Sequence, residues 1–288
     1  MKEYKVDMHI HTCYSDGDTT PNEIIKKAKR EGIRIIAITD HDTILGNKNI
    51  TLSKDEIQGI TVVPGIELSA KIDKGRLHIL GYGIDINNKM LNEKMIELRN
   101  NSLYSIIGLL AQLKKDYKII FLTKDIQKLL NKEKNIGRPD LAKLCVRYGY
   151  AKTVAEAFDK YLEEAYKKTK LTNKGLQYKE CIKLIKESGG IAVLAHPHTL
   201  KMTNKELEHF IKKLIKYGLE GIEVFHSNHT PEQTHEYLAL ALKYNLLISS
   251  GSDYHGKSVK PDINMATGKN NNLKVTHFNL IEKIKTTY

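Results

Sequence analysis

The stretch Asp7-Met8-His9-Ile10-His11 closes the first β-type run of the chain, and a helix signal follows it. In Thr20-Pro21-Asn22-Glu23, Thr20 can cap a helix, Pro21 suits the first helical position and Glu23 completes a capping box. The next apolar run, Arg34–Thr39, is again typical of a strand. A strand, a helix and a second strand in this order predict a β/α fold.

The same alternation continues in two separate parts of the chain. Thr61–Val63 and Leu77–Tyr82 are further strand candidates, whereas helical patterns dominate residues 88–174, where Ile119–Leu122 is the only strand candidate. We therefore expect a barrel made from residues 1–87 and 175–288, with a helical insertion at 88–174. The helices expected in the insertion are Leu91–Lys115, Thr123–Leu130, Pro139–Tyr148 and Val154–Glu164. The later expected elements are helices Lys179–Glu187, Asn204–Tyr217 and Pro231–Tyr244 and strands Ile191–Ala195, Gly221–Phe225 and Leu246–Ser250.

Composition excludes several classes of protein. The chain has 288 residues, of which 41% are hydrophobic and 28% charged, so it is neither intrinsically disordered nor a small disulfide scaffold. No apolar stretch approaches the roughly 18 residues of a membrane span, and the N-terminus lacks a signal-peptide pattern. Its 3 scattered cysteines suit a reducing compartment, so we expect a cytoplasmic protein. The net charge of +12 favours anionic partners, but the lysines are scattered and we give the charge little weight.

The His, Asp and Glu residues are concentrated where the expected strands end. In β/α barrels these ends converge on one face, which carries the active site. Imidazole and carboxylate ligands without thiolates suit Zn, Mn or Fe. Their number favours two or three divalent ions, with Glu67 as a natural bridge. The segments at the ends of the expected strands carry His9, His11, Asp16, His41, Glu67, His196, His226, His229, Asp253 and His255.

Other candidates have ordinary interpretations. His209, His235 and His277 lie in helical or tail segments, so we expect surface or core roles for them, and His198 could belong to either class. His78 begins its strand, so it can join the cluster only if that strand runs differently or the barrel is distorted. We expect Asp40 and Asp42 to orient histidines and Cys13 to fill space beside the site.

These segments, in this order, resemble the motifs of the PHP (polymerase and histidinol phosphatase) superfamily of metal-dependent phosphoesterases. The resemblance spans most of the chain and implies a distorted seven-stranded β/α barrel with a trinuclear metal site, in which His78 also has a role. The matching motifs are Asp7-Met8-His9-Ile10-His11-Thr12 with Ser15-Asp16-Gly17, Ile38-Thr39-Asp40-His41-Asp42, Pro64-Gly65-Ile66-Glu67, His78 before Gly81-Tyr82, Ala195-His196-Pro197 and Gly251-Ser252-Asp253-Tyr254-His255.

The resemblance also implies three groups of metal ligands. The first ion would be held by His9, His11, Glu67 and Asp253. The second would be held by Glu67, His78 and His196, and the third by Asp16, His41 and His255. Asp7 would brace one of these ligands.

Within the superfamily, the chain resembles the stand-alone branch of nucleoside 3',5'-bisphosphate phosphatases and 5'-to-3' exonucleases acting on short RNA. The helical insertion, Gly137-Arg138-Pro139, and His226 with His229 carry this resemblance. Arg138 at a helix start suits a phosphate group, although a surface salt bridge is an equal alternative, and His229 is a second candidate for phosphate binding. The chain departs from the branch at Asp140, where a His is common, and in the Lys-rich stretch Tyr161–Leu171.

We therefore expect a metal-dependent hydrolase for phosphate esters of nucleotides or short oligonucleotides. A hydroxide activated by the ions would attack phosphorus in line. Arg138 would hold phosphoryl oxygens, and His226 or a metal-bound water would protonate the leaving group. A phosphatase for a non-nucleotide metabolite such as histidinol phosphate, or a non-catalytic metal-binding module, are the alternatives. We expect no membrane and no obligate protein partner.

Overall fold

The computed structural model describes residues 5–131, 136–169, 175–273 and 279–284. His277 and part of the Lys-rich stretch therefore lie outside the described residues. The chain divides into two compact units, a barrel unit of residues 1–93 and 175–288 and a helical unit of residues 94–174. No helix among the described residues combines the length and the apolar character needed to cross a membrane.

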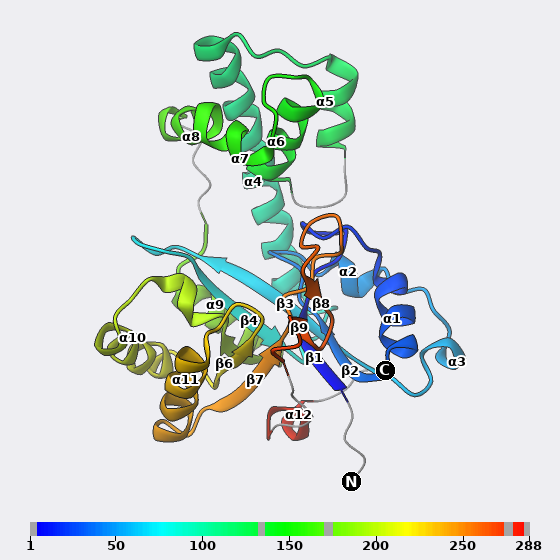
Figure 1. The fold of residues 1–288 in the computed structure, drawn as a ribbon, viewed down its shortest axis with the longest axis vertical. Coiled ribbons are helices and arrows are strands. Elements are labelled where there is room, and N and C mark those ends of the chain that lie inside the picture. Colours follow the sequence, from blue (N-terminus) through cyan, green and yellow to red (C-terminus); the bar gives the residue numbers. More distant parts are fainter. Residues whose placement is uncertain (1–4, 132–135, 170–174, 274–278, 285–288) are drawn as a thin grey trace. The chain divides into compact units, whose positions relative to one another are not determined.

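A seven-stranded sheet forms the centre of the barrel unit (Figure 1). Its strands follow chain order, and neighbours are parallel except that β4 is antiparallel to both β3 and β5. The sheet nearly closes, because the Asp253 N–H donates to the His9 carbonyl and the His11 N–H to the Tyr254 carbonyl, both at 2.9 Å. This arrangement confirms the predicted distorted β/α barrel. The strands are β1 (Lys5–Ile10), β2 (Ile33–Ile38), β3 (Thr61–Ala70), β4 (Leu77–Tyr82), β5 (Ile191–Leu194), β6 (Gly221–His226) and β7 (Leu247–Gly251).

Helices cover the outside of this sheet (Figure 1). The first begins as its sequence predicts, since the Glu23 N–H donates to Thr20 Oγ1 and the Thr20 N–H donates back to the Glu23 carboxylate. Its buried residues Ile24, Ile25 and Ala28 pack on the neighbouring strands. The helices of the barrel unit are α1 (Pro21–Arg30), α2 (Leu45–Lys48), α3 (Lys54–Ile57), α9 (Tyr178–Glu187), α10 (Asn204–Lys216), α11 (Pro231–Lys243) and α12 (Asn279–Lys283), with a short 3-10 helix at Pro197–Leu200.

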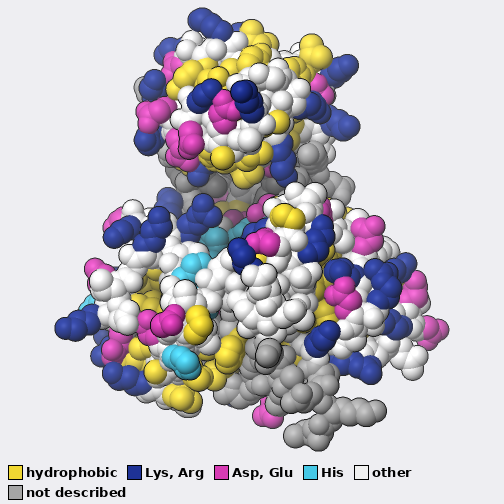
Figure 2. Space-filling model, viewed as in Figure 1, with side chains coloured by type: hydrophobic (Ala, Val, Ile, Leu, Met, Phe, Trp, Pro, Cys, Tyr) yellow, Lys and Arg dark blue, Asp and Glu magenta, His cyan; other side chains and the backbone are white. Residues whose placement is uncertain are grey.

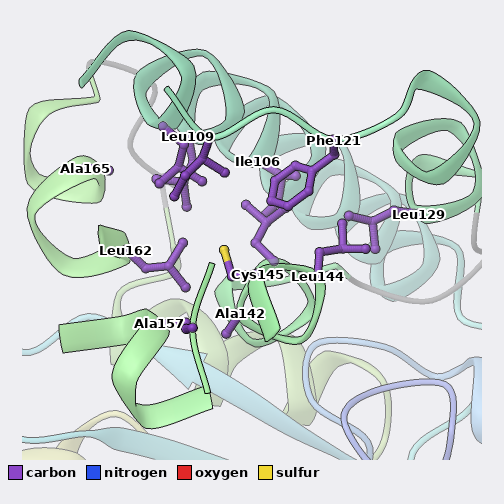
Figure 3. Packing of buried hydrophobic residues seen from close by; sticks show 14 of the residues in the cluster. Ile106, Leu109, Phe121, Leu129, Ala142, Leu144, Cys145, Ala157, Leu162 and Ala165 are labelled. Carbon is purple, nitrogen blue, oxygen red and sulfur yellow. The ribbon is translucent and has the colours of Figure 1, made fainter. Parts of the chain in front are cut away.

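The helical unit has its own hydrophobic core. Phe121, Leu109 and Leu162 are among the buried side chains that meet there (Figure 3). The long helix α4 (Lys89–Tyr117) begins in the barrel unit and continues into this one. The remaining helices are α5 (Thr123–Leu130), α6 (Arg138–Arg147), α7 (Val154–Ala157), a π-helix (Phe158–Leu162) and α8 (Glu163–Lys168).

Three features differ from the expected elements. The strand expected at Ile119–Leu122 is wrong: this segment has no strand partner and is held by tyrosine hydroxyls, with the Ile120 N–H donating to Tyr150 at 3.2 Å. The expected helix Val154–Glu164 is interrupted by the π-helix. β3 is longer than Thr61–Val63, because it pairs with β2 up to Pro64 and then with β4 from Gly65 onward.

The C-terminal segment contains elements for which the sequence showed no clear pattern. β8 (Ile263–Asn264) and β9 (Gly268–Lys269) form a short antiparallel pair. The loop between them reaches the barrel, where the Ala266 N–H donates to the Asp7 carboxylate at 2.7 Å. On the face shown in Figure 2, Lys and Arg side chains are mixed with Asp and Glu, in keeping with the small weight given to net charge.

Candidate metal centre

All nine predicted metal ligands lie in the barrel unit, at one end of the sheet. They come from strand ends and the loops directly after them, which the sheet brings together although the sequence separates them by up to 246 residues, from His9 to His255. β1 carries His9 and leads into His11 and Asp16, and His41 follows β2. Glu67 lies within β3, His78 near the start of β4, His196 after β5, and Asp253 and His255 after β7.

The direction of β4 explains how His78 joins the cluster. Because β4 is antiparallel to β3 and β5, its first residues lie beside the last residues of β3 and the end of β5. His78 is paired with Ser69 in the register, and its carbonyl accepts from the Ala195 N–H at 3.2 Å. One of the two conditions under which His78 could join the cluster, a strand that runs differently, is therefore met.

Glu67 is the centre of the cluster and is fully buried. Its Oε2 lies 3.1 Å from both His9 Nε2 and His11 Nε2. Its Oε1 lies 2.8 Å from both His78 Nδ1 and His196 Nε2. His41 Nδ1 also lies 3.2 Å from Oε2. Each carboxylate oxygen therefore faces a different set of imidazoles, which is the arrangement a bridging ligand needs.

The carboxylates of Asp253 and Asp16 extend the cluster, one on each side of His11. Asp253 Oδ1 lies 3.3 Å from His11 Nε2 and 3.8 Å from His9 Nε2. On the other side of His11, Asp16 Oδ1 lies 3.5 Å from His11 Nδ1 and 3.2 Å from His255 Nε2. His11, Asp16, His41 and His255 have ligand atoms that all lie within 4.8 Å of one another.

These distances fit divalent ions. Ligand atoms about 2.1 Å from a shared ion lie roughly 3 to 3.5 Å from each other. The pairs around Glu67 and Asp16 are 2.8 to 3.5 Å apart. Burial opposes ionisation of Glu67, but His41, His9 and His78 keep its pKa well below the usual value. Burial lowers the pKa of His41 to about 3. Against the effect of burial, hydrogen bonds to Asp253 and Glu67 raise the pKa of His11 to about 9. Because ionised carboxylates and neutral imidazoles are the forms that bind metal, His11 has to lose a proton when it binds an ion.

Two of the three aspartates expected to support ligands, Asp7 and Asp40, accept hydrogen bonds from backbone N–H and hydroxyl groups. The Asp7 carboxylate accepts from the Ser252 N–H at 2.9 Å and from the His9 N–H at 3.3 Å, next to two predicted ligands. Asp40 accepts from Ser15 Oγ at 2.5 Å, and that oxygen lies 3.4 Å from His11 Nδ1. Both aspartates are fully buried, and burial raises the pKa of each.

Sequence reasoning missed two charged residues that contact the predicted ligands. Glu223 in β6 is fully buried and contacts both His9 and His196. Lys260 Nζ lies 2.6 Å from Asp253 Oδ2. The position of Glu223 near the end of a strand was the available signal, whereas Lys260 lies in the segment without a clear pattern.

A second group of histidines lies beside the first. His198, His226 and His229 have ring nitrogens within 4.8 Å of one another. His226 Nδ1 accepts from the Asn228 N–H at 3.1 Å, so its Nε2 carries the proton, and this nitrogen lies 3.4 Å from Asp253 Oδ2. His229 Nδ1–H donates to the Val224 carbonyl at 2.9 Å, so its buried Nε2 is an acceptor.

The remaining residues singled out from the sequence lie outside these two groups. Arg138 begins α6 in the helical unit, where its guanidinium donates to Glu163 Oε1 at 3.1 Å and lies 4.5 Å from the centre of the Tyr166 ring. Asp140 caps the same helix by accepting from the Gly137 N–H at 3.0 Å. His209 and His235 are exposed on α10 and α11.

The matching family model has the description PHP domain and covers residues 7–229. The chain belongs to the PHP domain family. Among curated PHP relatives, it is 31% identical to the phosphoribosyl 1,2-cyclic phosphate 1,2-diphosphodiesterase of Eggerthella lenta over 87% of this chain and 94% of that protein. It is 29% identical to the 5'-3' exoribonuclease Rnm of Escherichia coli, covering 86% and 84% of the two chains. It is 28% identical to the 3',5'-nucleoside bisphosphate phosphatase of Chromobacterium violaceum, covering 87% of each chain.

A solved structure has the same PHP architecture. The crystal structure of a metal-dependent phosphoesterase from Bifidobacterium adolescentis superposes with a TM-score of 0.75 at 29% identity. The match covers 97% of this chain and 94% of that one, so it includes both the barrel and the helical insertion.

Proposed function

We propose that this protein is a metal-dependent phosphoesterase that hydrolyses phosphate esters of nucleotides or short oligonucleotides. The observation that carries the proposal is the Glu67 carboxylate, whose two oxygens face two different sets of imidazoles. Oε2 faces His9, His11 and His41, and Oε1 faces His78 and His196. Three further proposed ligands lie beside the Glu67 carboxylate, namely Asp16, His41 and His255. This arrangement suits chemistry that needs several positive charges around one phosphoryl group.

The residues present fit two or three divalent ions of Mn, Zn or Fe type. His9, His11, Glu67 and Asp253 would hold the first, Glu67, His78 and His196 the second, and Asp16, His41 and His255 the third. Such ions activate water near neutral pH and neutralise phosphoryl oxygens.

The second histidine group would act on the substrate. His226 presents an Nε2–H beside Asp253, so it can donate a hydrogen bond to the leaving oxygen. Its Nδ1 already accepts a backbone N–H, so Nε2 is its donor nitrogen. His229 presents an acceptor nitrogen, which can receive a hydroxyl hydrogen of the substrate. A hydroxyl group both donates and accepts, so it matches this pair.

The helical insertion would contribute to substrate recognition through Arg138. The Arg138 side chain is 37% exposed. Its contacts with Glu163 and Tyr166 fix the position of the guanidinium without covering it. A planar guanidinium at a helix start can hold a phosphate group. Phosphate would compete with Glu163 for this guanidinium.

The names of the relatives define the substrates to test. A nucleoside bisphosphate, an RNA and a cyclic phosphate of a sugar are the substrate types in the names of three relatives. The cyclic diester is a second candidate, because that relative has 31% identity to this chain, against 29% and 28% for the other two. Three free cysteines support a cytoplasmic location.

The experiment is metal analysis combined with a phosphoester panel. The purified protein, loaded with Mn²⁺ or Zn²⁺, is tested on 3',5'-bisphosphonucleotides, short RNA with a 5'-phosphate, a ribose 1,2-cyclic phosphate and histidinol phosphate. We expect metal-dependent release of phosphate or mononucleotides that a chelator abolishes. Turnover of histidinol phosphate alone would replace the nucleotide assignment, and no turnover of any ester would contradict the proposal.

A further inference from the structure

Glu223 joins two parts of the metal centre through a single buried carboxylate. Its Oε1 accepts from His9 Nδ1–H at 2.9 Å, and its Oε2 accepts from the backbone N–H of His196 at 2.8 Å. We propose that Glu223 is a positioning residue that holds His9 and His196 in their ligand orientations and so couples the first two ion sites. The inference rests on the metal centre of the proposed function and adds a residue and a coupling to it.

The first contact determines which nitrogen of His9 can bind metal. A neutral imidazole has one N–H and one lone pair. With the proton on Nδ1 and directed at Glu223, the lone pair is on Nε2. That atom lies 3.1 Å from both Glu67 Oε2 and His11 Nε2, at the first ion site. A carboxylate behind a ligating imidazole also makes the imidazole a stronger ligand.

The second contact holds an unusual backbone conformation. His196 has φ of +21° and ψ of 70°, which L-residues rarely adopt. The hydrogen bond from its N–H to Glu223 stabilises this conformation. In it, His196 Nε2 lies 2.8 Å from Glu67 Oε1, at the second ion site. One carboxylate therefore supports one ligand of each site.

Glutamine cannot replace this carboxylate although it has the same shape. Both partners of Glu223 are N–H donors, and a Gln side chain has only one accepting oxygen. Its amide N–H₂ would face the other donor. If the amide N–H₂ of the glutamine faced His9, the imidazole of His9 would carry its proton on Nε2. That nitrogen would then lack the lone pair that binds the first ion.

The test compares wild type, Glu223→Gln and a matched control, Tyr82→Phe. Tyr82 is also fully buried in the barrel, and its hydroxyl bonds to Ser249 Oγ at 2.9 Å, so the control removes a buried hydrogen bond without a ligand contact. Each metal-free protein is titrated with Mn²⁺ and Zn²⁺ by calorimetry, and bound ions are counted after gel filtration. Nitrogen-15 NMR of labelled histidines reports the His9 tautomer.

We expect Glu223→Gln to bind two ions about 10- to 100-fold more weakly and to keep the third, with an altered tautomer signal for one histidine. The control should bind like wild type. Wild-type affinity in Glu223→Gln, loss of all ions equally, or the same loss in Tyr82→Phe would each overturn the positioning role. If wild type itself binds no divalent ion, the metal centre of the proposed function fails as well, so the two failures are distinguishable.

Discussion

Gly251 lies directly against His9, where the end of β7 meets β1. A Cβ atom on residue 251 would lie 2.1 Å from the His9 Cβ and 2.7 Å from the His9 backbone nitrogen. Neither neighbour is the far end of a flexible chain, so the strands could not keep this separation with any other residue. The absence of a side chain at Gly251 therefore allows the barrel to close beside its first proposed ligand.

Gly251→Ala should destabilise the barrel and weaken metal binding together. Overpacking a filled core costs about 1–3 kcal/mol, so we expect a loss of about 2 kcal/mol and a Tm lower by roughly 4–8 °C. Gly175→Ala is the control, since its nearest neighbours, atoms of the Lys71 side chain, lie 3.7 Å away. Thermal unfolding and metal titration measure both effects. An unchanged Tm in Gly251→Ala would contradict the packing argument.

His41→Ala should abolish turnover while the protein still unfolds cooperatively. Its Nδ1 lies 3.2 Å from Glu67 Oε2 and belongs to the third ligand group, so the variant loses one ligand but little core packing. We expect kcat to fall more than about 100-fold, beyond the loss typical of residues that only support ligands. His235→Ala, at an exposed position of α11, is the control and should keep full activity. Full activity of His41→Ala would remove it from the site.

The fold was largely predictable because local signals agreed with the final pairing. Capping residues and apolar periodicity located α1 and α11 to within a residue or two. The length of β3 was not predictable from Pro64-Gly65, because the strand continues only by changing partner from β2 to β4. Ile119–Leu122 has a strand-like composition, but its backbone groups are satisfied by tyrosine hydroxyls that lie about 30 residues further on.

The candidate site was predictable to the extent that its residues occur at strand ends. His78 needed the direction of its strand, which no local pattern contains. Glu223 was not assigned a role, because its importance comes from two contacts with residues 214 and 27 positions away. Contacts of this kind depend on barrel closure and become visible only in three dimensions.

Glu208 should contribute stability that disappears in acid. A hydrogen bond from Tyr244 and one from Lys243 at 2.9 Å lower the pKa of Glu208 to about 2. Because the folded pKa is below the ordinary value of 4.5, the contribution is complete above about pH 4.5 and is lost as the pH falls towards 2. Glu208→Gln should therefore lower Tm slightly at pH 7 and have no effect near pH 2. Tyr244→Phe should reproduce part of this difference, and a Tm difference independent of pH would contradict the assignment.

Arg138→Ala should weaken substrate binding without affecting the metal centre. Its guanidinium is partly exposed and is held by Glu163 and the Tyr166 ring, which leaves donors for a phosphate group. We expect KM for phosphate-bearing substrates to rise about 10-fold, since a charged hydrogen bond contributes about 1.5–3 kcal/mol, with kcat and metal content little changed. Arg147→Ala is the matched control, because Arg147 pairs with Asp125 at 2.7 Å and lies over the Tyr148 ring in the same helix. Kinetics on a bisphosphonucleotide measure the effect. If KM and kcat are unchanged in Arg138→Ala, or change equally in the control, Arg138 forms only the salt bridge with Glu163.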